Sequence, residues 1–395
     1  MFSSRTNWNL LPNRLTQLLE EKRNSKAQVA DLTESNPTHC GFHYDSRAIL
    51  GFLAQESSLR YDPDPKGLLV ARMALCEYYR QWDVRLDPEQ IVLTASTSEA
   101  YSFLLRLLCN PGDSVLVPQP SYPLLEYLCQ LNDVHVAPYR LAYDGEWRID
   151  LDSLRSQLSN RSQAIILVHP NNPTGSYVTR DEGKALVNLA KERNLSLIVD
   201  EVFSKFDFGV ATNRVSTFAS TEHVLTFTLG GISKLLGLPQ MKLGWVVLSG
   251  PREHQSEALK KLEVIADTYL SVNTAIQHAL PELLKHQYSL TNQIRDRILR
   301  NLELLRSTVS SSPGVSVFSC EGGWNAILCL PQTRSDEEWC EFLLESSNVL
   351  FHPGHFYSLE LASCLVLSLL PDHTVFLNAI TESLRLVTQE TAVNK

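Results

Sequence analysis

Short apolar runs alternate with longer segments of helical periodicity through the first 250 residues of the chain. The apolar runs predict strands, and the most regular of them lie at residues 91–93, 114–117, 165–168 and 197–199. Strands that alternate with helices in this way are typical of parallel sheets with helical crossovers. We therefore expect an α/β fold with a doubly wound, mostly parallel sheet.

After about residue 250 the pattern changes to long charged helices followed by short strand candidates. The helices are expected at residues 252–269 and 281–310, and the strands near residues 315–318, 325–329 and 364–369. This part of the chain predicts a smaller α+β domain, which would also receive an amphipathic helix at residues 12–28. The large α/β domain would span residues 46–270, and the small domain would combine residues 1–45 with residues 271–395.

The composition is that of an ordinary globular protein of 395 residues, with 44% hydrophobic and 20% charged residues. The formal net charge is -9 and no basic block offsets it, which argues against nucleic acid as a partner. The N-terminus lacks the apolar core of a secretory signal, and no run approaches the roughly 20 apolar residues of a membrane span. A cytoplasmic location is expected.

Eight cysteines are spread from Cys40 to Cys364, and no two have Cys-x-x-Cys spacing. Several of them, such as Cys109, Cys129 and Cys329, lie inside apolar runs, where buried thiols are expected. This distribution argues against both a zinc site and a disulfide framework. No metal site is predicted.

Polar residues follow three of the apolar runs, in the order amide, carboxylate and amine. Asn172 comes after residues 165–168, in an Asn-Asn-Pro-Thr-Gly motif, whereas Asp200 ends the next run. Lys234 follows an apolar stretch at residues 224–228. Pyridoxal phosphate needs these three groups: an amine for a Schiff base, a carboxylate for the ring nitrogen and a donor for the ring oxygen. The order of the three sites predicts that the large domain binds this cofactor.

The turn between a predicted strand and the helix that follows it offers a place for the phosphate. Ser96 stands three residues before Glu99, as in a capping box, so the turn has an interpretation as a simple helix cap. The same geometry leaves free N–H groups at the positive end of a helix dipole, where phosphate binds. Beside the lysine site, we favour phosphate binding at Ser96 and Thr97.

Two of the candidate residues have equally ordinary alternatives. Asp200 suits a helix N-cap, but an ionised carboxylate at a strand end also suits the ring nitrogen, which it would keep protonated. Tyr122 lies in a Pro-Ser-Tyr-Pro turn. Its ring would stack on the cofactor or merely pack in that turn.

These motifs together resemble the class I/II aminotransferases, which are pyridoxal phosphate enzymes of the aspartate aminotransferase fold. The resemblance runs from residue 31 to about residue 370. It rests on the motif at residues 171–175, on Asp-Glu-Val-Phe at residues 200–203, and on Ser-Lys at residues 233–234 with Gly-Leu-Pro behind it. It implies a ping-pong aminotransferase that moves an amino group between an amino donor, such as an amino acid, and a 2-oxo acid.

The resemblance also implies a role for each matching residue. Lys234 would hold the cofactor as a Schiff base and, once displaced by substrate, move the proton at the substrate α-carbon. Tyr61 would reach the phosphate from a second subunit, so the site would require a homodimer. The positions that would contact the cofactor are Tyr61, Ser96, Thr97, Tyr122, Asn172, Asp200, Phe203, Ser233 and Lys242.

Three positions depart from the family pattern. Phe203 stands where a tyrosine usually donates to the ring oxygen. Lys242 replaces an arginine that clamps the phosphate, which keeps the charge but loses the two-pronged guanidinium. Val366 occupies the place of the arginine that grips the substrate α-carboxylate. The substrate then either lacks that carboxylate, as an amine or a sugar-like carbonyl does, or meets another basic residue such as Arg47.

Two other outcomes for the site stay open. A lyase or β-eliminating enzyme would use the same cofactor, because the same carbanion partitions either way. A non-catalytic cofactor-binding relative would have lost its substrate clamp. Among the histidines, His169 is expected to be a hydrogen-bonded structural residue, and His352 and His355 are expected to lie in a loop.

Overall fold

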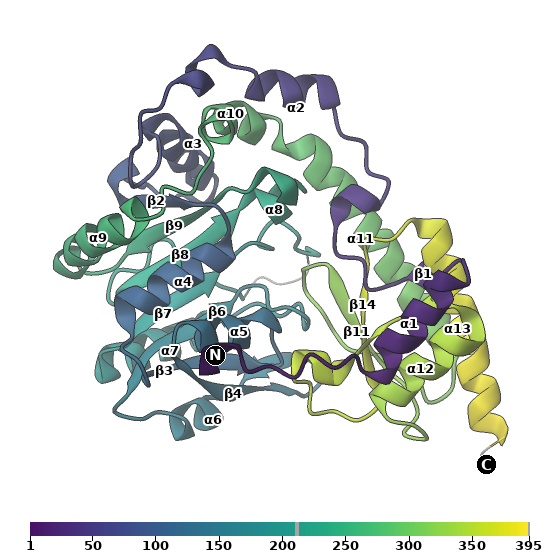
Figure 1. The fold of residues 1–395 in the computed structure, drawn as a ribbon. Coiled ribbons are helices and arrows are strands. Elements are labelled where there is room, and N and C mark those ends of the chain that lie inside the picture. The colour runs from purple at the N-terminus through teal and green to yellow at the C-terminus, as the bar shows by residue number, and fades with distance from the viewer. Residues whose placement is uncertain (210–212, 394–395) are drawn as a thin grey trace.

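An eight-stranded sheet forms the larger part of the computed structural model, which describes residues 1–209 and 213–393 (Figure 1). The strands in order across the sheet are β2 (Ile91–Thr94), β9 (Gly244–Ser249), β8 (Thr226–Gly231), β7 (Ser196–Asp200), β6 (Ser162–Val168), β3 (Ser114–Gln119), β4 (His135–Tyr143) and β5 (Trp147–Ile149). Strand β9 runs antiparallel to both of its neighbours and β5 antiparallel to β4, whereas all other neighbours are parallel. The predicted doubly wound, mostly parallel α/β sheet is confirmed.

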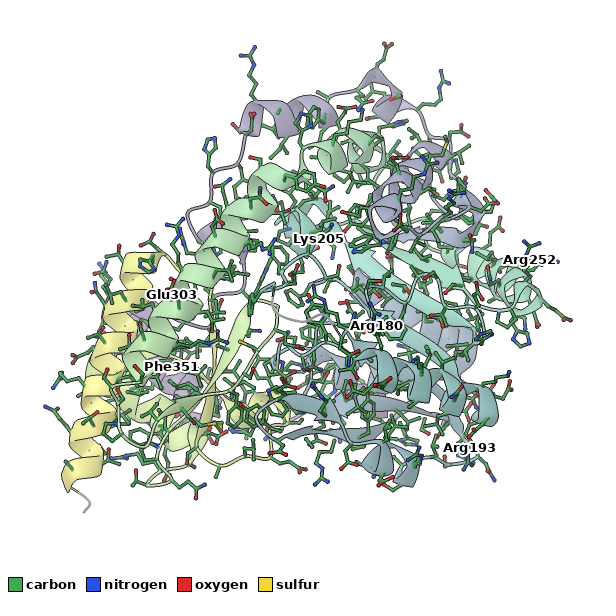
Figure 2. The ribbon with its side chains drawn as sticks, turned by 180° about the vertical axis from the view of Figure 1, so that it is seen from behind. Arg180, Arg193, Lys205, Arg252, Glu303 and Phe351 are labelled. Carbon is green, nitrogen blue, oxygen red and sulfur yellow. A yellow bond between two sulfur atoms is a disulfide. The ribbon has the colours of Figure 1, made fainter. Side chains whose placement is uncertain are left out.

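Helices cover both faces of this sheet, and the strand residues are therefore buried on both sides. Ile166 and Val168 of β6 pack on one face, whereas Ile165 and Leu167 pack on the other. The first face is covered by α4 (Thr97–Leu108), α5 (Leu124–Leu131) and α9 (Arg252–Asp267). The second face is covered by α3 (Leu69–Tyr79), α6 (Leu151–Ser156) and α7 (Arg180–Arg193), whose two end residues are labelled in Figure 2.

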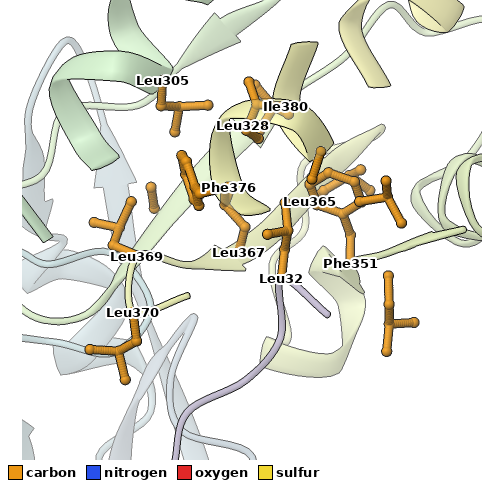
Figure 3. Close-up of a cluster of buried hydrophobic side chains, with 14 of the residues drawn as sticks. Leu32, Leu305, Leu328, Phe351, Leu365, Leu367, Leu369, Leu370, Phe376 and Ile380 are labelled. Atoms are coloured by element: carbon orange, nitrogen blue, oxygen red, sulfur yellow. The ribbon is translucent and has the colours of Figure 1, made fainter. Parts of the chain in front are cut away.

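A second, antiparallel sheet lies at the centre of the smaller part of the molecule. Within the described residues it has four strands, in the order β10 (Ser316–Val317), β11 (Asn325–Cys329), β14 (Cys364–Ser368) and β13 (His352–Pro353). The surrounding helices are α1 (Arg14–Asn24), α11 (Gln287–Val309), α12 (Asp336–Ser347) and α13 (His373–Val393). Leu32, Phe351, Leu367 and Phe376 meet in the core of this part (Figure 3). Leu15 of α1 joins the same core, so the N-terminal segment packs with the C-terminal one.

Helix α10 (Thr274–Lys285) differs from the sequence prediction in both its start and its packing. A single helix was expected from residue 281, but α10 begins at Thr274, capped by Asn273, and α11 follows after His286. Its buried face packs with α3 and β9, through residues such as Leu280 and Trp245. The division into two domains remains a proposal, and we place its boundary after α10 rather than at residue 270. In the described part of the chain, no helix is long and apolar enough to cross a membrane.

Cys329 and Cys364 form a disulfide between β11 and β14. The expectation of a buried thiol at Cys329 is therefore wrong, although a single bridge is not the disulfide framework that the cysteine spacing argued against. The two residues are 35 positions apart in the sequence, and only the antiparallel register of the strands places them directly opposite each other. The other six cysteines, including Cys109 and Cys129, are free in the described residues.

Candidate active site

The three predicted strand-end sites meet at one edge of the large sheet. Asp200 is the last residue of β7, which pairs in parallel with β6 on one side and β8 on the other. Asn172 follows the end of β6, and Lys234 lies in the short helix α8 (Ile232–Leu235) directly after β8. Because the carboxyl ends of parallel strands lie at the same edge, the fold brings the amide, the carboxylate and the amine together.

The amine of Lys234 is packed between two aromatic rings. Its Nζ atom lies 4.9 Å from the ring centroid of Trp324 and 5.7 Å from that of Phe203. Burial lowers the pKa of Lys234, and the negative charge of Asp200 opposes that effect. A lowered pKa leaves more of the amine in its neutral, nucleophilic form, which Schiff base formation requires.

The carboxylate of Asp200 is buried with little to balance its charge. Burial raises its pKa to about 6, against the effects of the Val202 N–H, the Tyr101 hydroxyl and Lys234. The Val202 N–H donates to Oδ1 at 3.1 Å. A protonated ring nitrogen is the kind of partner that such a buried carboxylate lacks, because a nearby cation favours its ionised form. The donor set at this edge therefore fits the pyridine ring of pyridoxal phosphate.

Tyr101 is a site residue that the sequence did not reveal. Its hydroxyl is buried near Asp200 without a hydrogen bond of standard geometry to any described residue. Burial, followed by the charge of Asp200, raises the pKa of Tyr101 well above its usual value. The residue lies one helical turn after Thr97 on α4, and that spacing was the one signal that pointed toward it.

The turn before α4 has unpaired amides where the phosphate was predicted. Ser96 is the N-cap, and its Oγ accepts the N–H of Glu99 at 3.2 Å. Only half of the capping box forms, because the Glu99 carboxylate accepts the N–H of Ala95 at 2.7 Å and not that of Ser96. The N–H groups of Ser96, Thr97 and Ser98 donate to no described residue. They remain available to an anion at the positive end of the helix.

Glycines bring the ends of β8 and β9 against this turn. A Cβ at Gly244 would lie 3.1 Å from the carbonyl carbon of Ser96, and one at Gly231 would lie 3.8 Å from Cγ2 of Thr97. Ser233 is the second residue of α8 and follows Gly231 by two positions. Lys242 precedes Gly244 by two residues and has an exposed side chain. This edge is the place where the phosphate residues were predicted to gather.

Asn172 is held by a residue from the other sheet. The Nδ2 atom of Asn325, at the start of β11, donates to Oδ1 of Asn172 at 2.6 Å. The sequence gave no sign of this contact, because the two residues are 153 positions apart. It joins the start of β11 to the loop that follows β6.

The two predicted aromatic partners of the cofactor occupy different environments. Tyr122 is largely buried, and burial together with the charge of Asp200 raises the pKa of its hydroxyl, which places it beside the site. Tyr61 is 81% exposed, so within a single subunit it belongs to the surface. A phosphate contact from Tyr61 would require a second subunit.

The histidine predictions can be compared directly with the structure. His169 is fully buried; its Nε2 donates to the carbonyl of Val215 at 2.9 Å, and its Nδ1 accepts the N–H of Val178 at 3.1 Å. Burial lowers the pKa of His169 to about 4, so the ring is neutral. The prediction of a structural histidine is confirmed. His352 lies in β13 rather than in a loop, whereas His355 lies in a 3-10 turn, residues Gly354–Tyr357.

Val366 lies in β14 directly opposite Ile327 on one side and His352 on the other. Its side chain is 1% exposed and packs with apolar residues of the large sheet. Strand alternation places Val366 on the same face as Asn325, which touches Asn172. The face of the smaller sheet that meets Asn172 is therefore apolar at position 366. Arg47, on α2 (Ser46–Leu53), has an exposed side chain.

A buried lysine and aspartate at the carboxyl edge of a doubly wound sheet, next to free helix amides, define the architecture of a pyridoxal phosphate enzyme. Comparison with known proteins agrees with that class. The chain belongs to the class I and II aminotransferases, whose family model matches residues 25–376. It is accordingly a pyridoxal phosphate-dependent aminotransferase.

Curated relatives and solved structures cover most of the chain. It is 27% identical over 347 residues to the glutamate-pyruvate aminotransferase of Haemophilus influenzae, which covers 85% of this chain and 84% of the relative. The corresponding Escherichia coli K12 enzyme is 29% identical over 307 residues, or 77% of this chain and 75% of the relative. An alanine aminotransferase structure from Pyrococcus furiosus matches with a TM-score of 0.89 at 21% identity, covering 98% of this chain and all of that one. This last likeness supports the fold.

We expect Phe203→Tyr to lower the pKa of the Schiff base that is predicted at Lys234. Phe203 lies against Lys234 and Trp324, so a hydroxyl added there would reach the site. A hydroxyl that donates to the ring oxygen stabilises the anionic form of that oxygen. The oxygen then attracts the imine proton less strongly, so the pKa of the imine falls. A hydrogen bond to a charged group is worth about 1.5–3 kcal/mol, so the shift should exceed roughly one pKa unit. Titration of the visible absorbance band measures it.

Phe208→Tyr is the matched control for this substitution. Phe208 is partly buried in the same segment and contacts the smaller core instead of the lysine. That variant should titrate like the native protein. If Phe203→Tyr does not titrate at lower pH than both, position 203 does not face the ring oxygen.

Proposed function

We propose that the site formed by Lys234, Asp200 and Asn172 transfers an amino group from an amino donor to a 2-oxo acid by a ping-pong mechanism. The observation that carries this proposal is the buried Lys234 amine beside the buried Asp200 carboxylate at the ends of β8 and β7. When bound, pyridoxal phosphate supplies an electron sink for the negative charge that develops at the substrate α-carbon.

The roles of the chain's own residues follow from their positions. Lys234 Nζ would hold the cofactor and, once released, would carry the proton that leaves the substrate α-carbon. Asp200 would keep the ring nitrogen protonated, Asn172 would donate to the ring oxygen, and Tyr122 would pack on the ring. The amides and hydroxyls of Ser96, Thr97 and Ser233 would hold the phosphate, with Lys242 supplying positive charge.

A half-reaction tests this proposal. The cofactor-loaded protein is mixed with a panel of amino donors in the absence of an acceptor. Loss of the visible Schiff base band and growth of the amine form of the cofactor support the proposal, and a 2-oxo acid should restore the original band. A donor with a β leaving group that releases ammonia and the leaving group would identify a lyase. No spectral change with any donor would identify a non-catalytic binding protein.

We also propose that the enzyme is a homodimer whose site is completed by Tyr61 of the second subunit. The proposal is supported by an exposed apolar surface, hereafter the α3 surface, made of Leu59, Tyr61, Leu69, Val70 and Met73. Their side chains are between 43% and 88% exposed, and three of the five lie in α3. Apolar patches of this kind mark protein interfaces. A cytoplasmic location is likewise a proposal; six free cysteines in the described residues support it, whereas the Cys329–Cys364 disulfide counts against it.

We expect Met73→Asp to convert the dimer to a monomer and to weaken cofactor binding. A charge placed in the middle of the α3 surface loses its water when two subunits meet, which disfavours association. Sedimentation equilibrium should then give 44.5 kDa, the mass of one chain, instead of twice that mass. Val375→Asp, at an equally apolar and 44% exposed position on α13, is the control and should stay dimeric. A native protein that sediments as a monomer contradicts the proposal.

A further inference from the structure

Asn325 connects the smaller sheet to the proposed ring-oxygen donor. Its Nδ2 atom donates to Oδ1 of Asn172 at 2.6 Å. We propose that Asn325 is a positioning residue that decides which atom of Asn172 faces the cofactor. The inference rests on the proposed role of Asn172 and extends it to a residue that had no role before.

The chemistry of the amide group makes the choice of atom matter. An asparagine side chain has an acceptor oxygen on one side and a donor NH₂ on the other. With Oδ1 of Asn172 engaged by Asn325, its Nδ2 is left without an acceptor among the described residues and is free to donate. If Asn172 turned while Asn325 stayed in place, two NH₂ groups would meet and the hydrogen bond would be lost. Asn325 therefore selects the orientation that donates to an anionic ring oxygen.

Asn325 is held by a strand and not by a flexible loop. It pairs with Ser368 of β14, and its strand neighbours Trp324 and Ala326 point into the buried core of the smaller part. The facing loop is braced as well, because Oδ1 of Asn171 accepts the Thr174 hydroxyl at 3.0 Å. A donor fixed in this way specifies orientation better than one on a mobile segment.

The absence of a tyrosine at position 203 gives this contact more weight. Phe203 offers the ring oxygen no hydrogen bond, so the oxygen depends more strongly on Asn172. Because Asn325 belongs to β11, the position of the smaller sheet sets the orientation of that donor. A movement of the smaller sheet away from the large one would release Asn172 and change how firmly the imine holds its proton.

A double-mutant cycle tests the proposal without measuring turnover. Asn325→Leu keeps a similar size but removes the donor, so Asn172 is free to turn and the ring oxygen loses its fixed partner. We expect the pKa of the Lys234 Schiff base, titrated by absorbance without substrate, to rise by roughly half to one unit. Asn172→Ala alone should raise it at least as much, and Asn325→Leu should add nothing in the Asn172→Ala background. Cofactor affinity, measured by equilibrium dialysis, should weaken in parallel.

The outcomes separate this inference from the proposed function. A cofactor-saturated native protein without a Schiff base band overturns both. Two outcomes overturn the positioning role and leave the proposed function intact. In the first, Asn325→Leu has the same Schiff base pKa as the native protein. In the second, Asn325→Leu raises that pKa as much in the Asn172→Ala background as in the native background. Asn325→Ser retains a donor, so its Schiff base pKa should lie between those of the native protein and Asn325→Leu. If the leucine variant does not fold, the serine variant is compared with the native protein and with Asn172→Ala instead.

Discussion

Replacement of Lys234 by alanine should abolish transamination while the protein remains folded. In the proposed mechanism the residue provides both the amine that holds the cofactor and the group that moves the substrate proton. General acid–base catalysis alone contributes about 10²–10⁴-fold, so the loss should reach at least four orders of magnitude when the covalent link is lost as well. The fold should tolerate the change because the lysine is a buried amine whose burial already disfavours its charge.

Chemical labelling locates the attachment independently of activity. Borohydride reduction of the cofactor-loaded protein, followed by peptide mapping, should place the cofactor on Lys234 and leave Lys234→Ala unlabelled. Lys205 is the matched control, because burial also lowers its pKa, to about 8, and it follows Asp200 by five residues. Its Nζ lies 4.3 Å from the ring centroid of Trp82 instead of at the end of β8. Label on Lys205, or on no lysine, would contradict the assignment of Lys234 as the residue that holds the cofactor.

We expect the native enzyme either to use donors without an α-carboxylate or to bind that carboxylate through another basic residue such as Arg47, and Val366→Arg to improve its use of common α-amino acids. Val366 is buried opposite Ile327 and His352, and it provides no charge. An arginine there would meet a carboxylate with two charge-assisted hydrogen bonds, each worth about 1.5–3 kcal/mol. A gain of about 3 kcal/mol would raise kcat/KM for α-amino acids roughly 100-fold.

A half-reaction screen that pairs each α-amino acid with its decarboxylated amine measures this preference. Val366→Leu is the control for size without charge and should leave the preference unchanged. The thermal stability of Val366→Arg should be measured alongside the screen, because a buried guanidinium without a partner destabilises the fold. Suppose that the native enzyme strongly prefers α-amino acids and that Arg47→Ala leaves this preference intact. That result would exclude two hypotheses: that the enzyme needs no α-carboxylate clamp, and that Arg47 replaces the clamp.

The amino-acid sequence by itself determined the architecture of the large sheet and the identity of its main polar residues. Short apolar runs separated by helical segments favour a mostly parallel sheet joined by crossovers, whereas the antiparallel directions of β9 and β5 were not predicted. In such a sheet the residues that follow neighbouring strands share one edge, whatever the length of the intervening helices. Asn172, Asp200 and Lys234 were predictable as a group for this reason. The structural role of His169 was equally local, because a histidine inside an apolar run must be neutral and hydrogen-bonded.

The tertiary structure alone decided the contacts made between the two sheets. Asn325 meets Asn172, and Cys329 meets Cys364, because the antiparallel register of β11 and β14 and the packing of the smaller sheet place them together. Neither register nor packing is encoded in a local pattern, since shifting a strand by one residue would reverse which side chains face the site. The same reason explains α10, whose apolar stripe fits either part of the molecule and was assigned only by its contacts with α3. The periodicity of apolar residues predicts that one face of a helix or strand is buried. Which other element covers that face is decided by the packing of the whole chain.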